Sequence, residues 1–345
     1  MTAAGRWLAR RTDEQVFGAC LAGIAAAVGL FLVVPLTPQF LAIHRVPTNL
    51  DYNVIGKPEG RVTAFWALAM ASFGCAVWQW RRGRRPSVRL LAAGVALLTL
   101  LALLVPPVAS EDVYAYSFYG RVQSFYHVNP YVSFPEQYSL DPWYHLWSWR
   151  LYGPVYGPPF LLLLRVVAAA AGQSLLAFVV MMKLLLVAAE LLAVWMLARA
   201  LRRRRPGAGG AAGAAGTTDA RWPVLLIAWN PMVLQAVAMS AHVDALLLLA
   251  VAGAVLAHAR GRHLAAFLLL VLTFLVKVYM GPLAALYGLW LAFARVPGRP
   301  LGRRLAGLAG LGGLGAVATA LAYLPYAGAG TRLFASAVDV SDHFS

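Results

Sequence analysis

Two adjacent carboxylates stand where a long apolar stretch ends. Residues 90–109 are almost all apolar, and Glu111 and Asp112 follow directly after Ser110. About 20 apolar residues are enough to cross a bilayer as a helix, so these acids lie at the end of a predicted membrane helix. A carboxylate at this position acts either as a general base or cation ligand at the membrane face, or as a surface acid that caps a helix.

Two further polar groups interrupt apolar runs later in the chain. His242 and Asp244 lie in the sequence SAHVD, and Lys277 lies in TFLVKVYMGP, with Tyr279 beside it. Ionisable side chains at membrane depth are costly unless they pair or function. His242 and Asp244 therefore either pair structurally or line a polar site. Lys277 either extends to the interface or binds a ligand phosphate.

The segment 110–155 is unusually rich in aromatic and polar residues. Tyr and Trp at a membrane interface usually form an anchoring belt, which accounts for Trp143, Trp147 and Trp149. A belt alone does not require the turn NPY at 129–131, and we expect a surface helix over 113–127. The segment also contains these titratable side chains: Arg121, His127, Glu136, Asp141 and His145. Lys183 and Glu190, seven residues apart in a later apolar run, are expected to have a structural role.

The composition excludes a soluble globular domain. Hydrophobic residues make up 61% of the chain and charged residues 12%, and the mean hydropathy is +0.69. These values are typical of a multi-pass membrane protein. The net charge of +16 does not indicate nucleic-acid binding, because the basic residues flank apolar runs. Cys20 and Cys75 lie within apolar runs, so we expect neither a disulfide framework nor a zinc site.

The basic clusters predict the topology, since positive loops stay in the cytoplasm. These clusters are Arg6 to Arg11, residues 81–89, residues 202–205, Arg260 with Arg262, and Arg295 to Arg304. We expect an all-α polytopic membrane protein whose 345 residues form one transmembrane domain. Its predicted helices lie near 17–36, 61–80, 90–109, 175–199, 222–240, 243–259 and 305–325, with 264–294 as a short hairpin. The acids at 111–112 then face outward.

Two apolar segments do not fit the topology as simple membrane-spanning helices. If 156–172 crossed the membrane, the basic residues 202–205 would face outward, so we interpret it as a re-entrant or juxtamembrane helix. The segment 264–294 is too short for two full crossings, which need about 40 residues, and we expect it to turn near Lys277–Pro282. The segment 110–172 is therefore predicted to be an outer loop of juxtamembrane helices. Residues 201–221 are predicted to be a flexible cytoplasmic linker.

Five short motifs, in this order along residues 105–285, resemble one known family. They are Asp112-Val113-Tyr114-Ala115-Tyr116, Asn129-Pro130-Tyr131, Tyr156-Gly157-Pro158, Trp229-Asn230-Pro231 with Ala241-His242-Val243-Asp244-Ala245, and Leu275-Val276-Lys277. The chain resembles the GT-C superfamily of polyprenyl-phosphate-sugar-dependent glycosyltransferases, and within it the actinobacterial α-1,6-mannosyltransferase group. The resemblance implies a GT-C-like helical bundle, with juxtamembrane helices after the third transmembrane helix.

The resemblance also implies a reaction and a place for it. An inverting enzyme in the bacterial plasma membrane would move a sugar, mannose by resemblance, from a polyprenyl-phosphate donor to a cell-envelope glycan or glycolipid outside the cytoplasm. Asp112 would be the catalytic base, with Glu111 able to share that role. The expected donor-phosphate residues are Lys277, Arg121 and Tyr279. The expected substrate-binding residues are His242, Asp244, Tyr114, Tyr116, Asn129, Tyr131 and Tyr156. The resemblance requires no cofactor, and it leaves open whether a divalent cation takes part.

The chain departs from the family pattern in two respects. Val243 precedes Asp244 where family members usually have Asn, and members are typically longer, so we expect a shortened or divergent member. Two other classes compete with the enzyme: a flippase or transporter that uses the same charges as a relay, and a non-catalytic protein of envelope assembly. The large aromatic outer loop and the lack of an internal repeat favour the enzyme.

Overall fold

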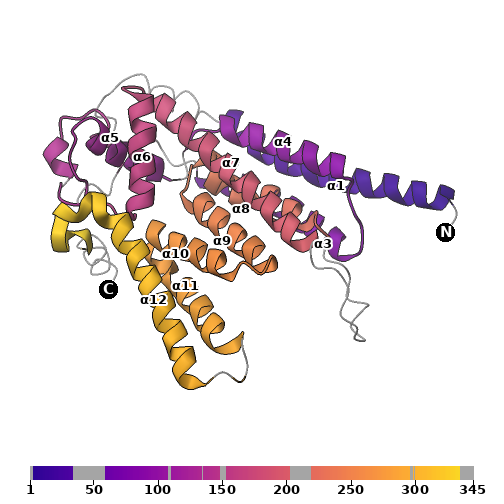
Figure 1. Cartoon of the computed structure of the whole chain (residues 1–345). Coiled ribbons are helices and arrows are strands. Elements are labelled where there is room, and N and C mark those ends of the chain that lie inside the picture. The colour runs from indigo at the N-terminus through magenta and orange to yellow at the C-terminus, as the bar shows by residue number, and fades with distance from the viewer. Residues whose placement is uncertain are drawn as a thin grey trace. The chain divides into compact units, whose positions relative to one another are not determined.

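The computed structural model describes residues 3–33, 59–107, 110–133, 135–147, 153–202, 219–295, 298 and 300–334. All regular structure in these ranges is helical (Figure 1). The expected all-α polytopic fold class is therefore confirmed. Most of the predicted linker 201–221 and the side chains of Arg6 to Arg11, His145 and Trp149 lie outside the described residues.

The helices follow the chain in a simple order. The α-helices are α1 (Ala3–Val33), α3 (Glu59–Arg81), α4 (Val88–Leu104), α5 (Asp112–Ser124), α6 (Pro158–Ala171), α7 (Leu175–Arg202), α8 (Pro231–Val233), α9 (Asp244–Ala259), α10 (His263–Val276), α11 (Gly281–Leu289) and α12 (Leu301–Tyr323). The 3₁₀ segments are η2 (Pro135–Tyr138), η3 (Tyr144–Leu146), η6 (Val278–Met280) and η8 (Leu324–Phe334). The π-helical segments are η4 (Val224–Ala228), η5 (Leu234–Met239) and η7 (Trp290–Ala294).

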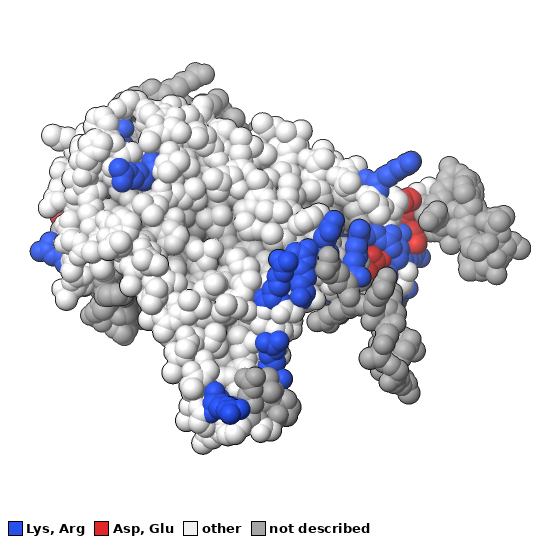
Figure 2. Space-filling view, viewed as in Figure 1, with Lys and Arg blue, Asp and Glu red and all other residues white. Residues whose placement is uncertain are grey.

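Several helices have the length and composition of membrane spans. Among the described residues, these are Thr12–Leu30, Leu175–Arg202 and Leu301–Leu333, and the broken pair Pro231–Met239 with Asp244–Ala259 makes a fourth if it counts as one span. Shorter apolar helices include α4, α6 and α10. The surface in Figure 2 is mostly uncharged, as expected for a protein in contact with lipid.

The chain divides into two compact units. Unit 1 comprises Met1–Val113 and Met182–Ala245, and unit 2 comprises Tyr114–Met181 and Leu246–Ser345. In unit 1, α1 packs against α3 and α4 (Figure 1). Its core includes the fully buried side chains of Phe17, Ile24 and Leu98.

Trp229 joins α4 to the segment that carries α8. Its buried indole donates a hydrogen bond to the carbonyl of Leu91 over 3.2 Å, and its ring lies where a side chain at Gly94 would be. A glycine in α4 therefore permits the close approach of the indole. This contact secures one end of the segment that leads to His242.

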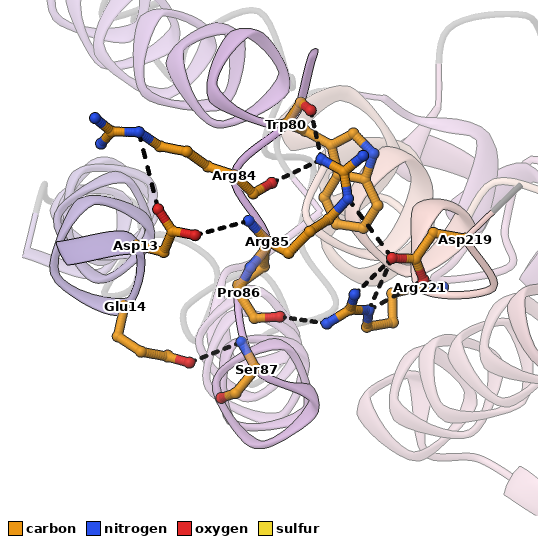
Figure 3. A network of polar contacts seen from close by, with 9 residues as sticks. All are labelled: Asp13, Glu14, Trp80, Arg84, Arg85, Pro86, Ser87, Asp219 and Arg221. Atoms are coloured by element: carbon orange, nitrogen blue, oxygen red, sulfur yellow. Dashed lines mark hydrogen bonds and ion pairs between the residues drawn. The ribbon is translucent and has the colours of Figure 1, made fainter. Parts of the chain in front are cut away.

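A polar network joins three segments at the basic end of unit 1 (Figure 3). Asp13 of α1 accepts from the backbone N–H of Arg85 over 3.1 Å, and Glu14 accepts from the N–H of Ser87 over 2.8 Å. Arg221 donates to Asp219 over 2.6 Å and to the carbonyl of Pro86 over 2.9 Å. The network therefore attaches the loop between α3 and α4 to both α1 and the start of the 219–240 segment.

Unit 2 is built around α10. This helix packs against α6, α11 and α12, and its buried face includes Phe267, Leu270 and Val271. The chain turns at Lys277, which follows the last residue of α10, so the 264–294 segment consists of two short helical pieces.

Two elements differ from the helices expected from the sequence. The apolar run 90–109 is helical only to Leu104, and the Lys183 ammonium group donates to the carbonyls of Leu103 and Val105 over 2.7 and 2.6 Å. Lys183 thus caps the end of α4. The run 222–240 is not one helix, because Asn230 caps α8 and Pro231 occupies its first turn.

Candidate active site

The central pair of the candidate site is Asp112 with His242, both in unit 1. Oδ2 of Asp112 lies 3.1 Å from Nδ1 of His242, and the two side chains are 35% and 25% exposed. An imidazole N–H at this distance donates a hydrogen bond to the carboxylate. The contact orients one oxygen of Asp112, and the carboxylate stays partly exposed.

A strained turn positions His242. The π-helix η5 ends at Met239, and Ala241 has a φ of 56°, a left-handed conformation that favours glycine. The backbone N–H of His242 donates to the carbonyl of Ala236 over 2.8 Å. Backbone strain and π-helical segments both cluster at functional sites. The turn ends one helix and points the imidazole toward Asp112.

Other residues of this turn add polar character to the site. Oδ2 of Asp244, in the first turn of α9, lies 3.8 Å from Nδ1 of His242. Ser240 is fully buried, and its hydroxyl has no hydrogen-bond partner among the described residues. At the other side of the pair, the hydroxyl of Ser110 accepts from the backbone N–H of Asp112 over 3.2 Å. Glu111 is half-buried beside it.

Arg121 belongs to a buried network in unit 2. Its Nε lies 2.5 Å from Oδ2 of Asp141, with side-chain exposures of 7% and 0%, and its Nη1 donates to Gln173 over 2.6 Å. Asp141 also accepts from the Tyr126 hydroxyl over 2.8 Å and from the N–H of Trp143 over 2.8 Å. Burial, and after it the adjacent carboxylate of Asp141, raises the pKa of Tyr126. These contacts favour a structural role for Arg121 over binding of a donor phosphate.

Three of the sequence motifs meet in unit 2. The side chain of Asn129 accepts from the N–H of Tyr131 over 3.0 Å, and the Tyr131 hydroxyl donates to the carbonyl of Tyr156 over 2.8 Å. The N–H of Gly157 donates to the carbonyl of Val276 over 3.0 Å. A side chain at position 157 would overlap the carbonyl of Leu275. The motifs NPY, YGP and LVK therefore form one chain of contacts that ends beside Lys277.

Lys277 stands at the break between α10 and η6. Its ammonium group lies 5.5 Å from the centre of the Tyr279 ring, a cation–π distance. Lys277 is half-buried, and Tyr279 is 62% exposed. The pair is thus presented at the surface of unit 2, where an anionic group can reach it.

Two expected substrate-binding tyrosines lie in the core instead. Tyr114 is 1% exposed and Tyr116 is 0% exposed. The ring of Tyr116 packs edge-on against Tyr156 and Phe160. These positions favour packing of the outer segment as their main role.

No set of three or more His, Cys, Asp or Glu side chains in the described ranges is arranged to hold a metal ion. The sequence does not predict the left-handed conformation of Ala241 or the burial of the Ser240 hydroxyl. Alanine gives no signal for a positive φ, since glycine and asparagine are the residues usually found there. Only the break between two apolar runs pointed to this turn.

The fold and the site define a polytopic membrane protein with an Asp–His pair at a break between helices. The chain belongs to the family described as alpha-(1->6)-mannopyranosyltransferase, N-terminal domain, whose model matches residues 20–294. This match confirms the resemblance to the α-1,6-mannosyltransferase group and makes the protein a glycosyltransferase. No curated protein and no solved structure matches the chain significantly.

Proposed function

We propose that the protein transfers mannose from a polyprenyl-phosphate mannose to a hydroxyl of a cell-envelope glycan or glycolipid, on the extracytoplasmic face of the bacterial plasma membrane. The observation that carries the proposal is the contact of 3.1 Å between Asp112 and His242. This contact orients the carboxylate of Asp112, which follows the end of a predicted membrane helix. The family match supports the sugar and the class of reaction.

Asp112 acts as the general base in this proposal. The acceptor hydroxyl attacks the anomeric carbon, its proton passes to the Asp112 carboxylate, and a bond forms between the hydroxyl oxygen and that carbon. The bond from the anomeric carbon to the phosphate oxygen breaks, and its electron pair leaves with the polyprenyl phosphate. A single displacement inverts the anomeric centre, so an α-linked product requires a β-linked donor.

The remaining roles follow from the chemistry of each residue. His242 holds the Asp112 carboxylate in the orientation required for proton transfer. Lys277, with Tyr279 beside it, offers a positive charge for the donor phosphate, where negative charge develops as the bond breaks. Asp244 lies close enough to His242 to bind a sugar hydroxyl at the same turn. Arg121 shapes the outer segment through Asp141 and does not bind the donor.

The test is transfer by the purified full-length chain in lipid vesicles. The donor is radiolabelled polyprenyl-phosphate mannose, and the acceptor is a synthetic α-mannoside. Asp112→Asn keeps the shape of the side chain and removes the base, so we expect kcat to fall about 10²- to 10⁴-fold with an unchanged elution profile. Glu136→Gln, at an exposed carboxylate outside the Asp112–His242 pair, is the control, with an expected change of less than about threefold.

Each competing class gives its own result in this assay. Full activity of the Asp112→Asn variant would show that Asp112 is not the general base. Movement of the labelled lipid across the bilayer without formation of a mannosyl product would indicate a flippase. Binding of donor with neither transfer nor movement would indicate a non-catalytic role in envelope assembly.

A further inference from the structure

Lys183 of α7 is a buried cation that binds main-chain oxygens of unit 1. The residue is 4% exposed, and its ammonium group donates to the carbonyls of Leu103 and Val105 over 2.7 and 2.6 Å. The carbonyl of Ala102 lies 3.5 Å from the same nitrogen. These oxygens stand at the carboxyl end of α4, where a helix carries partial negative charge. A lysine within an apolar run is costly unless it is paired, and this helix end provides its partners.

Two consecutive prolines explain why this helix end requires a donor from elsewhere in the chain. In a continuing α-helix, the carbonyls of Ala102 and Leu103 would accept from the N–H groups of residues 106–107. Both of these residues are prolines, which have no N–H, and both are buried. The N–H of Val105 donates to the carbonyl of Ala102 over 3.2 Å. Lys183 therefore provides the donor that the proline pair withholds from Leu103.

The capped end of α4 leads to the carboxylate of the proposed base. Val105 ends the helix with an extended backbone, at a φ of −70° and a ψ of 131°, and the proline pair 106–107 fixes the next two φ angles. Asp112 begins α5 seven residues after Val105. Its backbone N–H donates to the hydroxyl of Ser110 over 3.2 Å. Because the connection is short and partly rigid, we expect a change in the point where α4 ends to move Asp112.

The same helix contacts the segment that carries the histidine of the pair. α4 packs against η5, and the chain continues from η5 into the turn that holds His242. The Trp229 indole, earlier in that segment, donates to the carbonyl of Leu91 in α4 over 3.2 Å. Oδ2 of Asp112 lies 3.1 Å from Nδ1 of His242. Both members of the pair therefore depend on α4 for their position, and Lys183 holds the end of α4 that leads to Asp112.

We infer that Lys183 is a positioning residue for the transfer reaction. Its ammonium group caps α4 at the prolines that end the helix, and so sets the alignment of the Asp112 carboxylate with His242. Lys183 acts through Asp112 and does not contact the substrate. A misplacement of about 1 Å at a reacting group can lower a rate about 10²-fold, so a cap at a distance from the chemistry is sufficient. The inference rests on the proposed function, since it takes Asp112 as the general base.

The first test measures kcat and the donor KM of Lys183→Met, with radiolabelled polyprenyl-phosphate mannose and the full-length chain in lipid vesicles. Methionine is an unbranched side chain without an N–H donor. We expect kcat to fall about 10- to 100-fold, with the donor KM changed less than about twofold. Glu190→Gln is the matched control, since Glu190 is another buried ionisable residue of α7. It should change kcat less than about twofold.

Two combined variants separate positioning from a purely structural cap. In an Asp112→Asn background, Lys183→Met should lower kcat less than about threefold, because the base through which it acts is already absent. Pro106→Ala/Pro107→Ala returns two N–H donors to the helix end, so its addition to Lys183→Met should restore the thermal midpoint. It should leave kcat low, because α4 then continues beyond Leu104. If Lys183→Met alone fails to fold, this triple variant provides the kcat that tests the inference.

Three results would overturn the inference while the proposed function stands. An unchanged kcat in Lys183→Met, with Asp112→Asn impaired, would contradict a role of Lys183 in the reaction. Recovery of kcat together with the thermal midpoint in the triple variant would show that Lys183 only satisfies carbonyl groups. A full additional loss of kcat in the Asp112→Asn background would show that Lys183 acts independently of the base. Full activity of Asp112→Asn by itself would instead contradict the proposed function, and with it the inference.

Discussion

At the scale of single residues, the molecule uses its few carboxylates in two different environments. Asp112 is partly exposed and has a histidine as its neighbour at 3.1 Å, a setting that suits proton transfer. Asp141 is fully buried and accepts from Arg121, Tyr126 and Trp143, a setting that suits structure. The partners and burial of each acid, more than its residue type, distinguish the proposed base from the structural carboxylate.

The role of His242 can be separated from that of Asp112. Removal of a hydrogen bond to a charged group costs about 1.5–3 kcal/mol, so His242→Ala should lower kcat about 10- to 100-fold with little change in the acceptor KM. His242→Asn places an amide nitrogen near the position of Nδ1 and should restore most of kcat. Steady-state kinetics at saturating donor measure both. A rise in KM with unchanged kcat would assign His242 to substrate binding instead, and Asp244→Asn serves as the comparison at the same turn.

Arg121 gives a prediction about stability. Arg121→Ala leaves the Asp141 carboxylate buried without its cationic partner, at a cost of about 3–5 kcal/mol. We therefore expect a clear fall in the thermal midpoint in detergent, whereas the exposed Arg165→Ala should change stability by about 0.5 kcal/mol or less. If the Arg121→Ala protein is as stable as the unchanged protein but has a raised KM for the donor, Arg121 binds the donor phosphate and is not a structural residue.

At the scale of elements, the helix breaks carry the polar residues. His242 follows a π-helix, Asp244 begins α9, and Lys277 separates α10 from η6. Irregular backbone within a membrane protein is tolerated where it faces protein or a water-filled cavity. The sequence predicts where these breaks occur, because polar residues interrupt apolar runs. It does not predict their form, since a left-handed alanine and a π-helix depend on tertiary packing.

Gly157 tests how closely two of these elements must approach. Gly157→Ala places a methyl group against the Leu275 carbonyl, and backbone cannot move aside as a side chain can. We expect a loss of about 1–3 kcal/mol together with a raised donor KM, because Leu275 lies two residues before Lys277. Thermal denaturation and donor kinetics measure these effects. Gly310→Ala, in the open part of α12, should be neutral or stabilising, and equal behaviour of the two variants would show that the contact is unimportant.

At the scale of the whole molecule, much of the fold and less of the site follow from the sequence. Apolar runs and basic clusters predict an all-helical membrane protein, and the segment 156–172, predicted to be a re-entrant or juxtamembrane helix, contains the short apolar helix α6. The positions of Asp112, His242 and Lys277 were predicted as polar interruptions. The burial of Tyr114, Tyr116 and Arg121 was not, because their neighbours in the sequence are the same whether they face substrate or core.

The ion pair between Asp219 and Arg221 gives a prediction about how the stability of the protein depends on pH. Burial alone would raise the pKa of Asp219, but its hydrogen bonds with Arg221 and the charges of Arg221 and Arg85 hold that pKa below its usual range. A carboxyl whose folded pKa lies below its unfolded value of about 3.9 stabilises the fold fully above about pH 5. That contribution is lost as the pH falls through the folded pKa. The thermal midpoint of Asp219→Asn should therefore lie below that of the unchanged protein at pH 6.

The two midpoints should converge as the pH falls below the unfolded pKa of about 3.9 and through the lower folded pKa, because the protonated carboxyl of Asp219 no longer pairs with Arg221. The difference at pH 6 should also shrink in high salt, since the pair is partly exposed and mobile ions screen it. Glu136→Gln, at an exposed position outside this network, controls for general changes in charge and should leave both trends intact. A difference that shows no decrease at all as the pH falls below about 3.9, the unfolded pKa, would show that Asp219 stabilises the fold through packing or hydrogen bonding of either protonation state, and that its charge contributes nothing.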